Sequence, residues 1–196
     1  MAKLIGVIGA TGTGKTTLCE NAGYPFIKTD VSGVYKEMGL DPKLPMDLLT
    51  RLKVQRAILR KHESMWRDQL LKYAKALTVV TDRTPICFMA YTLAEISGYR
   101  ELTAEEEVAV TDYLQACDNA LEDYFDGMFH LAGRPFAVNV ADGKVRATQN
   151  FGYHSHYQAL SIGLTTERVR LSRRHICYTT MLDDRVATLR NFAGSL

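Results

Sequence analysis

One segment near the start of the chain constrains the fold more than any other. The apolar run from Leu4 to Ile8 leads directly into a glycine-rich loop from Gly9 to Thr16, and a stretch compatible with a helix follows. A strand, a tight turn and a helix in this order form the first half of a crossover unit, which is the connection used between parallel strands. The segment therefore predicts an α/β fold built on a parallel sheet.

The same alternation continues along the chain. Apolar runs of strand length are separated by stretches with helical periodicity, as expected for helices that cover both faces of a sheet. We predict a doubly wound, five-stranded parallel sheet with strand order 2-3-1-4-5. The strands are expected at about 3–8, 24–28, 77–81 and 127–131, with a fifth somewhere within 168–179.

Capping and spacing signals indicate where the helices begin and end. A glycine ends the first helix, a run of apolar residues at helical spacing predicts one long amphipathic helix, and two pairs of capping residues open later helices. In chain order these signals are Gly23, the run from Met46 to Ala76, Thr103 with Glu106 for a helix to about Tyr124, and Thr180 with Asp183.

Length and composition bound the remaining possibilities. With 196 residues, 46% of them hydrophobic, the chain can form one core, and we expect a single domain over 1–196. A net charge of +2 does not by itself indicate a nucleic-acid or membrane surface. No apolar run approaches the roughly 20 residues of a membrane span, and the four cysteines lack metal-ligand spacing. We expect a cytoplasmic protein with reduced thiols and no membrane partner.

The glycine-rich loop matches the pattern G-x-x-x-x-G-K-[ST] of a P-loop. Its backbone N–H groups and the following helix N-terminus can point at phosphate oxygens. Lys15 is expected to reach the β- and γ-phosphates of ATP, and Thr16 to offer its hydroxyl to Mg²⁺. The residues expected to bind the nucleotide are Gly9, Ala10, Thr11, Gly12, Thr13, Gly14, Lys15, Thr16 and Thr17.

A carboxylate at the end of a neighbouring strand would complete such a site. Asp82 follows the apolar run 77–81 and is the leading Mg²⁺ ligand, while Arg83 places a guanidinium beside the phosphates. Alternatively, Asp82 and Arg83 cap the helix that begins near Pro85.

These residues resemble the nucleoside and nucleotide kinases of the thymidylate kinase and deoxynucleoside kinase group. The runs 81–86 and 89–92 also resemble small AAA-type P-loop proteins of bacteriophages and the related ribosylnicotinamide kinase domain. The resemblance implies that a carboxylate after the second strand approaches the acceptor hydroxyl, and Asp30 is the matching residue. Asp30 or Ser32 could instead be a helix N-cap.

The resemblance also implies arginines on a lid that surround the transferred phosphoryl group. The segment 132–150 is expected to be an irregular loop that forms either this lid or a surface connection. No spacing selects the lid residues, and the cluster 168–174 is equally consistent with a solvated charge run or a contact to polynucleotide phosphate. The candidates are Arg134, Lys144, Arg146, Arg168, Arg170, Arg173 and Arg174.

Two further groups are given structural interpretations. His154 and His156 have the spacing of two metal ligands on a strand, but a surface helix is the favoured reading. Tyr91 and Tyr99 lie where a base could stack, although packing in the core or at the rim is favoured for each.

Together, these features predict an ATP-dependent phosphotransferase that moves the γ-phosphate to a hydroxyl of a nucleoside or nucleotide, with ATP and Mg²⁺ as cofactors. Lys15, Asp30, Asp82 and Arg83 are the expected catalytic residues. One alternative acceptor is 5-hydroxymethyluracil in phage DNA, which would place the protein in the host cytoplasm. A second alternative is a P-loop ATPase that transfers phosphate only to water.

Overall fold

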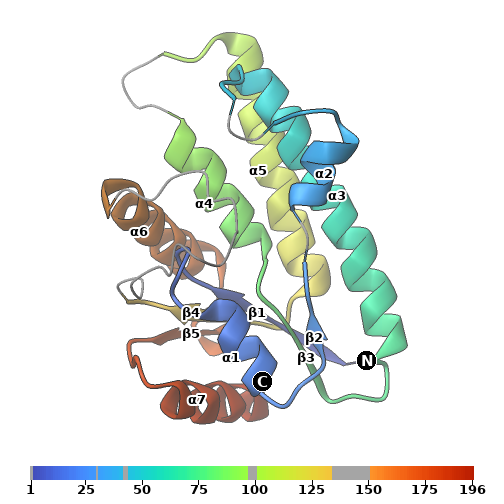
Figure 1. The fold of residues 1–196 in the computed structure, drawn as a ribbon, viewed down its shortest axis with the longest axis vertical. Coiled ribbons are helices and arrows are strands. Elements are labelled where there is room, and N and C mark those ends of the chain that lie inside the picture. The colour runs from blue at the N-terminus through green and yellow to red at the C-terminus, as the bar shows by residue number, and fades with distance from the viewer. Residues whose placement is uncertain (1, 30, 42–43, 97–100, 134–150) are drawn as a thin grey trace.

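The computed structural model describes residues 2–29, 31–41, 44–96, 101–133 and 151–196. Its centre is a five-stranded sheet of order β2-β3-β1-β4-β5, in which every neighbouring pair of strands is parallel (Figure 1). The strands are β1 (Lys3–Ile8), β2 (Phe26–Ile27), β3 (Thr78–Thr81), β4 (Gly127–Leu131) and β5 (Arg174–Cys177). The predicted α/β fold and strand order are confirmed.

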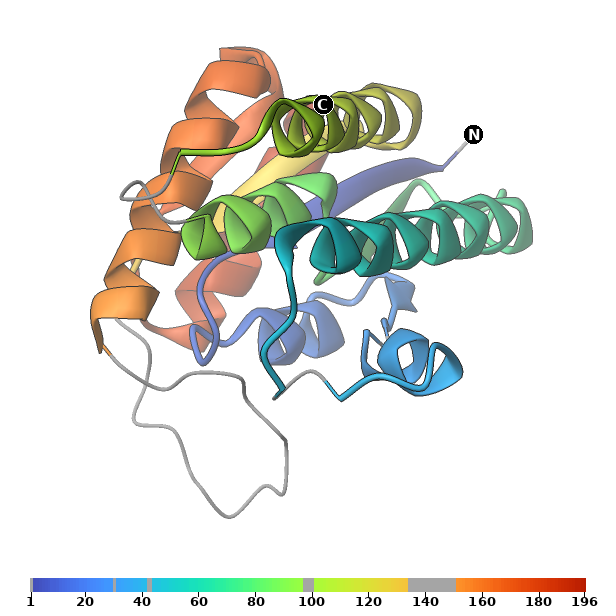
Figure 2. The same cartoon turned by 90° about the horizontal axis from the view of Figure 1, so that it is seen from above.

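Helices pack on both faces of this sheet (Figures 1 and 2). The first and last helices share one apolar core with the sheet, which includes Leu18 and Leu189, and a larger core on the other face contains Trp66. The helices are α1 (Lys15–Asn21), α2 (Ser32–Glu37), α3 (Leu48–Lys72), α4 (Pro85–Glu95), α5 (Ala104–Tyr124), α6 (Phe151–Arg168), a 3-10 turn (Leu171–Arg173) and α7 (Leu182–Ser195). None of the helices in the described ranges is long and apolar enough to cross a membrane.

Most of the predicted helix signals are present. Gly23 has a positive φ of 78° just after α1. Thr103 and Glu106 form a complete capping box at the start of α5: the Thr103 hydroxyl accepts from the Glu106 N–H, and the Glu106 carboxylate accepts from the Thr103 N–H. Both signals succeed because they depend only on residues within one turn of the chain.

Three expected boundaries differ from the structure. The second strand is only Phe26–Ile27, an edge strand that pairs with β3 alone. The long helix covers 48–72 instead of 46–76, because the Asp47 side chain caps its N-terminus by accepting from the Thr50 N–H. The proposed start of the last helix at Thr180 is wrong: Met181 is the N-cap of α7 and provides no side-chain cap.

Candidate active site

The P-loop has the backbone geometry that its glycines predict. Gly9, Gly12 and Gly14 have φ values of 149°, 80° and 88°, a region that other residues rarely adopt. Gly14 is the N-cap of α1, so the free N–H groups at the start of this helix belong to the loop. A Cβ atom at Gly9 would lie 2.7 Å from Thr13 Oγ1, which shows how closely the loop folds on itself.

The Lys15 side chain folds back onto the first residues of the P-loop. Its Nζ donates to the carbonyl oxygens of Gly9 at 2.8 Å and Ala10 at 2.9 Å, and the residue is 9% exposed. Burial lowers the pKa of Lys15. An ammonium group held in this way is partly desolvated, so an anion that approaches it interacts more strongly than it would with a lysine in water.

Two side chains from distant helices hold the P-loop in place. Gln158 of α6 accepts from the Ala10 N–H at 3.2 Å and donates to the Leu131 carbonyl at 3.1 Å. Arg185 of α7 donates from Nη1 to the Thr13 carbonyl at 2.7 Å. The loop is therefore supported by the helices on both faces of the sheet.

Asp82 lies directly opposite the start of α1. Its Oδ2 accepts a 2.6 Å hydrogen bond from the Thr16 hydroxyl, and its Oδ1 accepts from Thr29 at 3.3 Å. Two hydroxyls and a carboxylate offer the hard oxygen donors that Mg²⁺ prefers, and Mg²⁺ needs only one or two protein ligands beside substrate phosphates. Thr16 and Asp82 therefore fit a Mg²⁺ site.

The alternative role for Asp82 and Arg83 as helix caps is not what the structure shows. Thr84 is the N-cap of α4, and its hydroxyl accepts from the Cys87 N–H at 3.2 Å. Because Thr84 satisfies this helix end, the carboxylate of Asp82 can face the P-loop.

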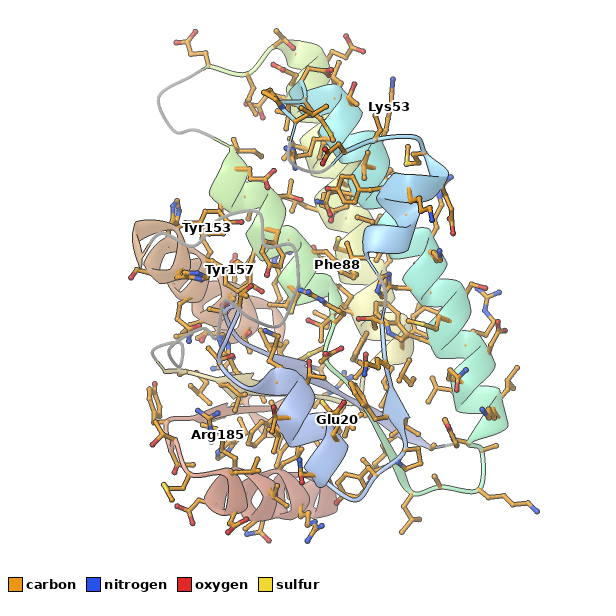
Figure 3. The ribbon with its side chains drawn as sticks, viewed as in Figure 1. Glu20, Lys53, Phe88, Tyr153, Tyr157 and Arg185 are labelled. Atoms are coloured by element: carbon orange, nitrogen blue, oxygen red, sulfur yellow. The ribbon has the colours of Figure 1, made fainter. Side chains whose placement is uncertain are left out.

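Tyr91 of α4 connects Arg83 to the P-loop. Its hydroxyl lies 3.1 Å from Thr11 Oγ1, and the Arg83 guanidinium lies 5.8 Å from the centre of its ring. The Tyr91 ring also packs against Tyr157 of α6, with 4.4 Å between the ring centroids; Figure 3 labels Tyr157 beside α4. The packing interpretation of Tyr91 is confirmed, but this residue packs at the phosphate site itself.

The charges around Tyr91 change its ionisation. Burial opposes formation of the phenolate, but Arg83 and then Lys15 outweigh it and lower the pKa of Tyr91. The Tyr91 hydroxyl also contacts Thr11 of the P-loop. The Arg83 guanidinium therefore lies against the ring of a tyrosine whose hydroxyl contacts the P-loop.

A second polar group lies at the far end of α4. Arg51 of α3 forms an ion pair with Glu95, with Nε 2.9 Å from Oε2. Burial raises the pKa of Glu95 and of its neighbours Tyr35 and Tyr153, and Arg51 acts against that increase in each group. This group joins α2, α3, α4 and α6 on the side of the sheet that holds the larger core.

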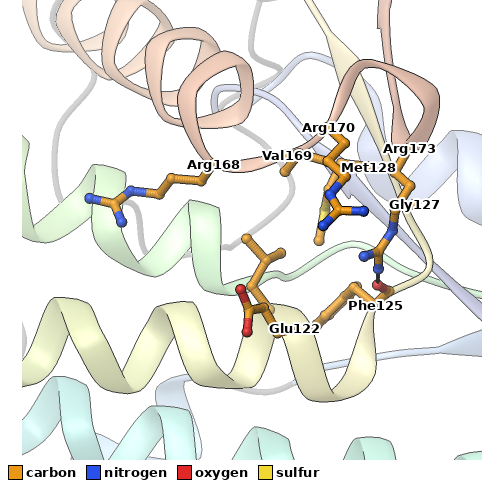
Figure 4. A pocket seen from close by; sticks show the side chains of 9 residues that line it. Glu122, Phe125, Gly127, Met128, Arg168, Val169, Arg170 and Arg173 are labelled. Atoms are coloured by element: carbon orange, nitrogen blue, oxygen red, sulfur yellow. Dashed lines mark hydrogen bonds between the residues drawn. The ribbon is translucent and has the colours of Figure 1, made fainter.

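The arginines at 168–174 lie at the other end of the sheet. A cleft of about 340 Å³ opens beside Gly127, the first residue of β4, whereas the P-loop lies where the strands end (Figure 4). Most of these arginines bind the protein itself. Arg168 pairs with Asp118, Arg173 donates to the carbonyls of Phe125 and Asp126, and Arg174 donates to those of Thr166 and Val169. These side chains hold helix ends and strand starts together.

The histidines of α6 and β4 lie apart from any cluster of metal-binding side chains in the described residues. His154 and His156 lie on the helix α6, as favoured from the sequence, but only His156 is at the surface, because His154 is buried. His130 of β4 is fully buried between Ser161 and Thr165 of α6. Among the residues that the structure describes, no group of three or more His, Cys, Asp or Glu side chains could hold a metal ion.

Some expected residues lie outside the described part of the chain. These are Asp30, Tyr99 and the residues 134–150 of the expected lid, with Arg134, Lys144 and Arg146. The helix α2 has Val31 as its N-cap, with no side-chain capping bond.

Gln158, Arg185 and Tyr157 were missed by the sequence reasoning. Each lies on a helix without a motif, and each contacts the site only because the sheet brings α6 and α7 to the P-loop. One usable signal was the position of Arg185 on an otherwise apolar face of the last helix, between Leu182 and Leu189. A buried arginine needs acceptors, and the P-loop carbonyls supply one.

Comparison with solved structures finds the same fold in several proteins. NadR in complex with NR superposes with a TM-score of 0.69 at 16% identity, covering 98% of this chain and 52% of NadR. The deoxyadenosine kinase from M. mycoides with bound dCTP gives 0.67 at 14% identity, covering 98% and 100% of the two chains. Thymidylate kinase from Candida albicans gives 0.59 at 12%, covering 99% and 92%.

This chain spans about half the length of NadR and nearly the full length of deoxyadenosine kinase and thymidylate kinase. No protein-family profile and no curated protein sequence matches it. At 12–16% identity the likeness shows the fold. The chain therefore has the P-loop fold that nucleoside and nucleotide kinases share, with the strand order predicted from its sequence.

Proposed function

We propose that this protein transfers the γ-phosphate of ATP to a hydroxyl group of a nucleoside or nucleotide. The observation that carries the proposal is the contact between Thr16 and Asp82, 2.6 Å apart, beside a P-loop whose Lys15 is buried. This arrangement joins a triphosphate-binding loop to a site for the metal that accompanies ATP. The kinase names of the structural neighbours support the same reaction type.

In the proposed reaction, the acceptor oxygen attacks the γ-phosphorus as the bond to the β–γ bridging oxygen breaks, and ADP leaves. Lys15 exchanges its two carbonyl partners for phosphate oxygens, and Arg83, held by Tyr91, binds the equatorial oxygens of the transferred group. Bound Mg²⁺, held by Thr16 and Asp82, would neutralise developing charge on the phosphates. Positioning and electrostatics supply most of the catalysis.

Asp30 is proposed to orient the acceptor hydroxyl and to take its proton. The preceding residue supports this position, because the Thr29 hydroxyl donates to Asp82 at 3.3 Å. Asp30 comes three residues after β2, and β2 ends at the end of the sheet where the P-loop lies, with Ile27 paired to Thr81. A carboxylate at this end of the sheet can reach a hydroxyl that lies in line with the γ-phosphate.

We infer that the acceptor is a free nucleoside or nucleotide and not a base within DNA. Three of the arginines at 168–174, which could have bound polynucleotide phosphate, instead contact Asp118 or backbone carbonyls: Arg168, Arg173 and Arg174. Arg170 lines the cleft beside the start of β4, at the end of the sheet opposite the P-loop. A DNA strand bound there would not bring a base to Asp82. These contacts argue against the arginines at 168–174 as the phosphate contacts that a DNA acceptor would need.

The test is incubation with ATP labelled at the γ-phosphate, Mg²⁺ and a panel of nucleosides, nucleoside monophosphates and hydroxymethyl-bearing DNA. Lys15→Ala is expected to reduce transfer by at least about a hundredfold, because the charge on the γ-phosphate loses its partner. Lys28→Ala is the control, since the Lys28 side chain is 72% exposed and pairs with the exposed Glu20. Label released solely as free phosphate would replace the kinase with an ATPase, and full transfer by Lys15→Ala would refute the site.

A further inference from the structure

Arg185 is a buried cation that no P-loop motif predicts. It lies on α7, is 3% exposed, and in Figure 3 its side chain extends from that helix toward the sheet. Its Nη1 donates to the Thr13 carbonyl and its Nε to the Thr179 carbonyl, both at 2.7 Å. One planar guanidinium thus joins two segments that are far apart in the sequence.

The bond to Thr13 acts on the part of the loop that would surround phosphate. Loop N–H groups can point at an anion only if the adjoining carbonyls turn toward the protein. Those buried carbonyls then need donors of their own. Ala10 O accepts from Lys15, Thr13 Oγ1 and the Thr13 N–H, whereas Thr13 O accepts from Arg185.

The bond to Thr179 reaches the connection between β5 and α7. This connection follows β5 at the edge of the sheet where the strands end, and its residues Tyr178 and Met181 are 72% and 66% exposed. Arg185 therefore fixes the P-loop relative to the exposed segment beside it. A lysine at this position could satisfy only one of the two carbonyls with comparable geometry.

We propose that Arg185 is a positioning residue for the donor nucleotide: by holding the Thr13 carbonyl, it keeps the P-loop in the conformation that binds ATP. The inference rests on the proposed function only for the identity of this nucleotide. Arg185 acts through Thr13 and does not contact the acceptor. Its loss should weaken ATP binding and leave the Michaelis constant for the acceptor unchanged.

Direct binding tests this role without requiring phosphotransfer. The Kd for ATP·Mg²⁺ is measured by titration with a fluorescent ATP analogue and competition by ATP, in wild type, Arg185→Met and Arg185→Lys. Arg185→Met is expected to raise the Kd by about tenfold or more, as for the loss of a charge-assisted hydrogen bond. Arg185→Lys should raise it by a smaller factor, because one carbonyl keeps a donor.

Arg190→Met is the matched control. Arg190 lies on the same helix, and its Nε donates to the Ala22 carbonyl at 3.0 Å, away from the P-loop. Both variants lose an arginine–carbonyl bond and can lower the melting temperature, but only Arg185→Met should change the Kd for ATP. A shift in melting temperature with an unchanged Kd would assign Arg185 a purely structural role and overturn the inference.

The outcomes separate this inference from the proposed function. If Arg185→Met does not fold, Arg185→Lys decides, and an ATP Kd equal to that of wild type overturns the inference. If wild type binds ATP but phosphorylates no acceptor, the proposed function fails while the effect of Arg185 on the Kd still stands. If wild type binds no ATP, both fail.

Discussion

Acid should destabilise this protein through a histidine that lies behind the active site. His130 is fully buried in β4, with Nε2 3.3 Å from Ser161 Oγ and Nδ1 3.4 Å from Thr165 Oγ1. Burial, and to a smaller extent the charge of Lys15, lowers the pKa of His130 from 6.5 to about 4. Ser161 and Thr165 belong to α6, which also carries Gln158 to the P-loop.

The direction of the effect follows from comparing the folded and unfolded chains. Above pH 6.5 the histidine is neutral in both, and its ionisation contributes nothing to stability. As the pH falls from 6.5 to about 4, the unfolded chain binds a proton that folded His130 does not, so the free energy of unfolding decreases. At a pH below about 4, the free energy of unfolding has fallen by about 3 kcal/mol because of His130. Buried His62, whose pKa is also about 4, adds a similar loss.

The contribution of His130 to this loss of stability is measured by urea unfolding of wild type and His130→Asn at about pH 7.5 and about pH 4.5. Near pH 7.5 the variant should be less stable by about 1–3 kcal/mol, because it loses buried polar contacts. Near pH 4.5 that deficit should shrink by about 2 kcal/mol, since the variant no longer carries a group that resists protonation. His156→Asn, an exposed histidine on α6, should follow wild type at both values. A deficit independent of pH would refute the reasoning.

Two further predictions concern the phosphate site. Asp82→Asn keeps an oxygen that can accept from Thr16 but removes the charge, so phosphotransfer at saturating ATP should fall by about a hundredfold or more, with partial recovery as MgCl₂ is raised. If the Asp82→Asn variant transferred phosphate at the wild-type rate at low Mg²⁺, the assignment of Asp82 as a metal ligand would be contradicted. Gly9→Ala should destabilise the protein by about 1–3 kcal/mol, because its Cβ would lie 2.7 Å from Thr13 Oγ1 and its φ is 149°. Gly163→Ala on α6, with nothing within 4 Å, should instead stabilise it by about 1 kcal/mol in thermal unfolding, and equal effects at both glycines would contradict the steric account.

The features that the sequence predicts correctly are those that local chemistry determines. The P-loop conformation follows from glycines at positions that need positive φ, and the start of α5 follows from the reciprocal bonds of Thr103 and Glu106. The strand order follows from crossover connections, which restrict how neighbouring strands can be joined. The positive φ values of the glycines and the capping box depend only on residues nearby in the chain.

The sequence was less informative where contacts between distant segments determine the structure. β2 is two residues long because it lies at the edge and pairs only with Val80 and Thr81 of β3. Thr180 does not cap α7, although its sequence spacing to Asp183 suggested that it would. The packing expected of Tyr91 is confirmed, but the contact of its hydroxyl with Thr11, 80 residues away, was not predicted. A pattern within one segment contains no information about partners at such separations.

The P-loop needs hydrogen-bond partners that its own motif does not contain. Its eight residues specify N–H groups that face phosphate, but that arrangement turns carbonyls toward the protein, and the motif contains donors for only some of them. Ala10 O is satisfied from within by Lys15 and Thr13, whereas Thr13 O depends on Arg185, 172 residues later, and the Ala10 N–H depends on Gln158, 148 residues later. These two bonds require that α6 and α7 pack on opposite faces of a correctly ordered sheet. Phosphate binding by this chain is therefore a property of the assembled fold, and substitutions in its last quarter should change nucleotide affinity without altering a single motif residue.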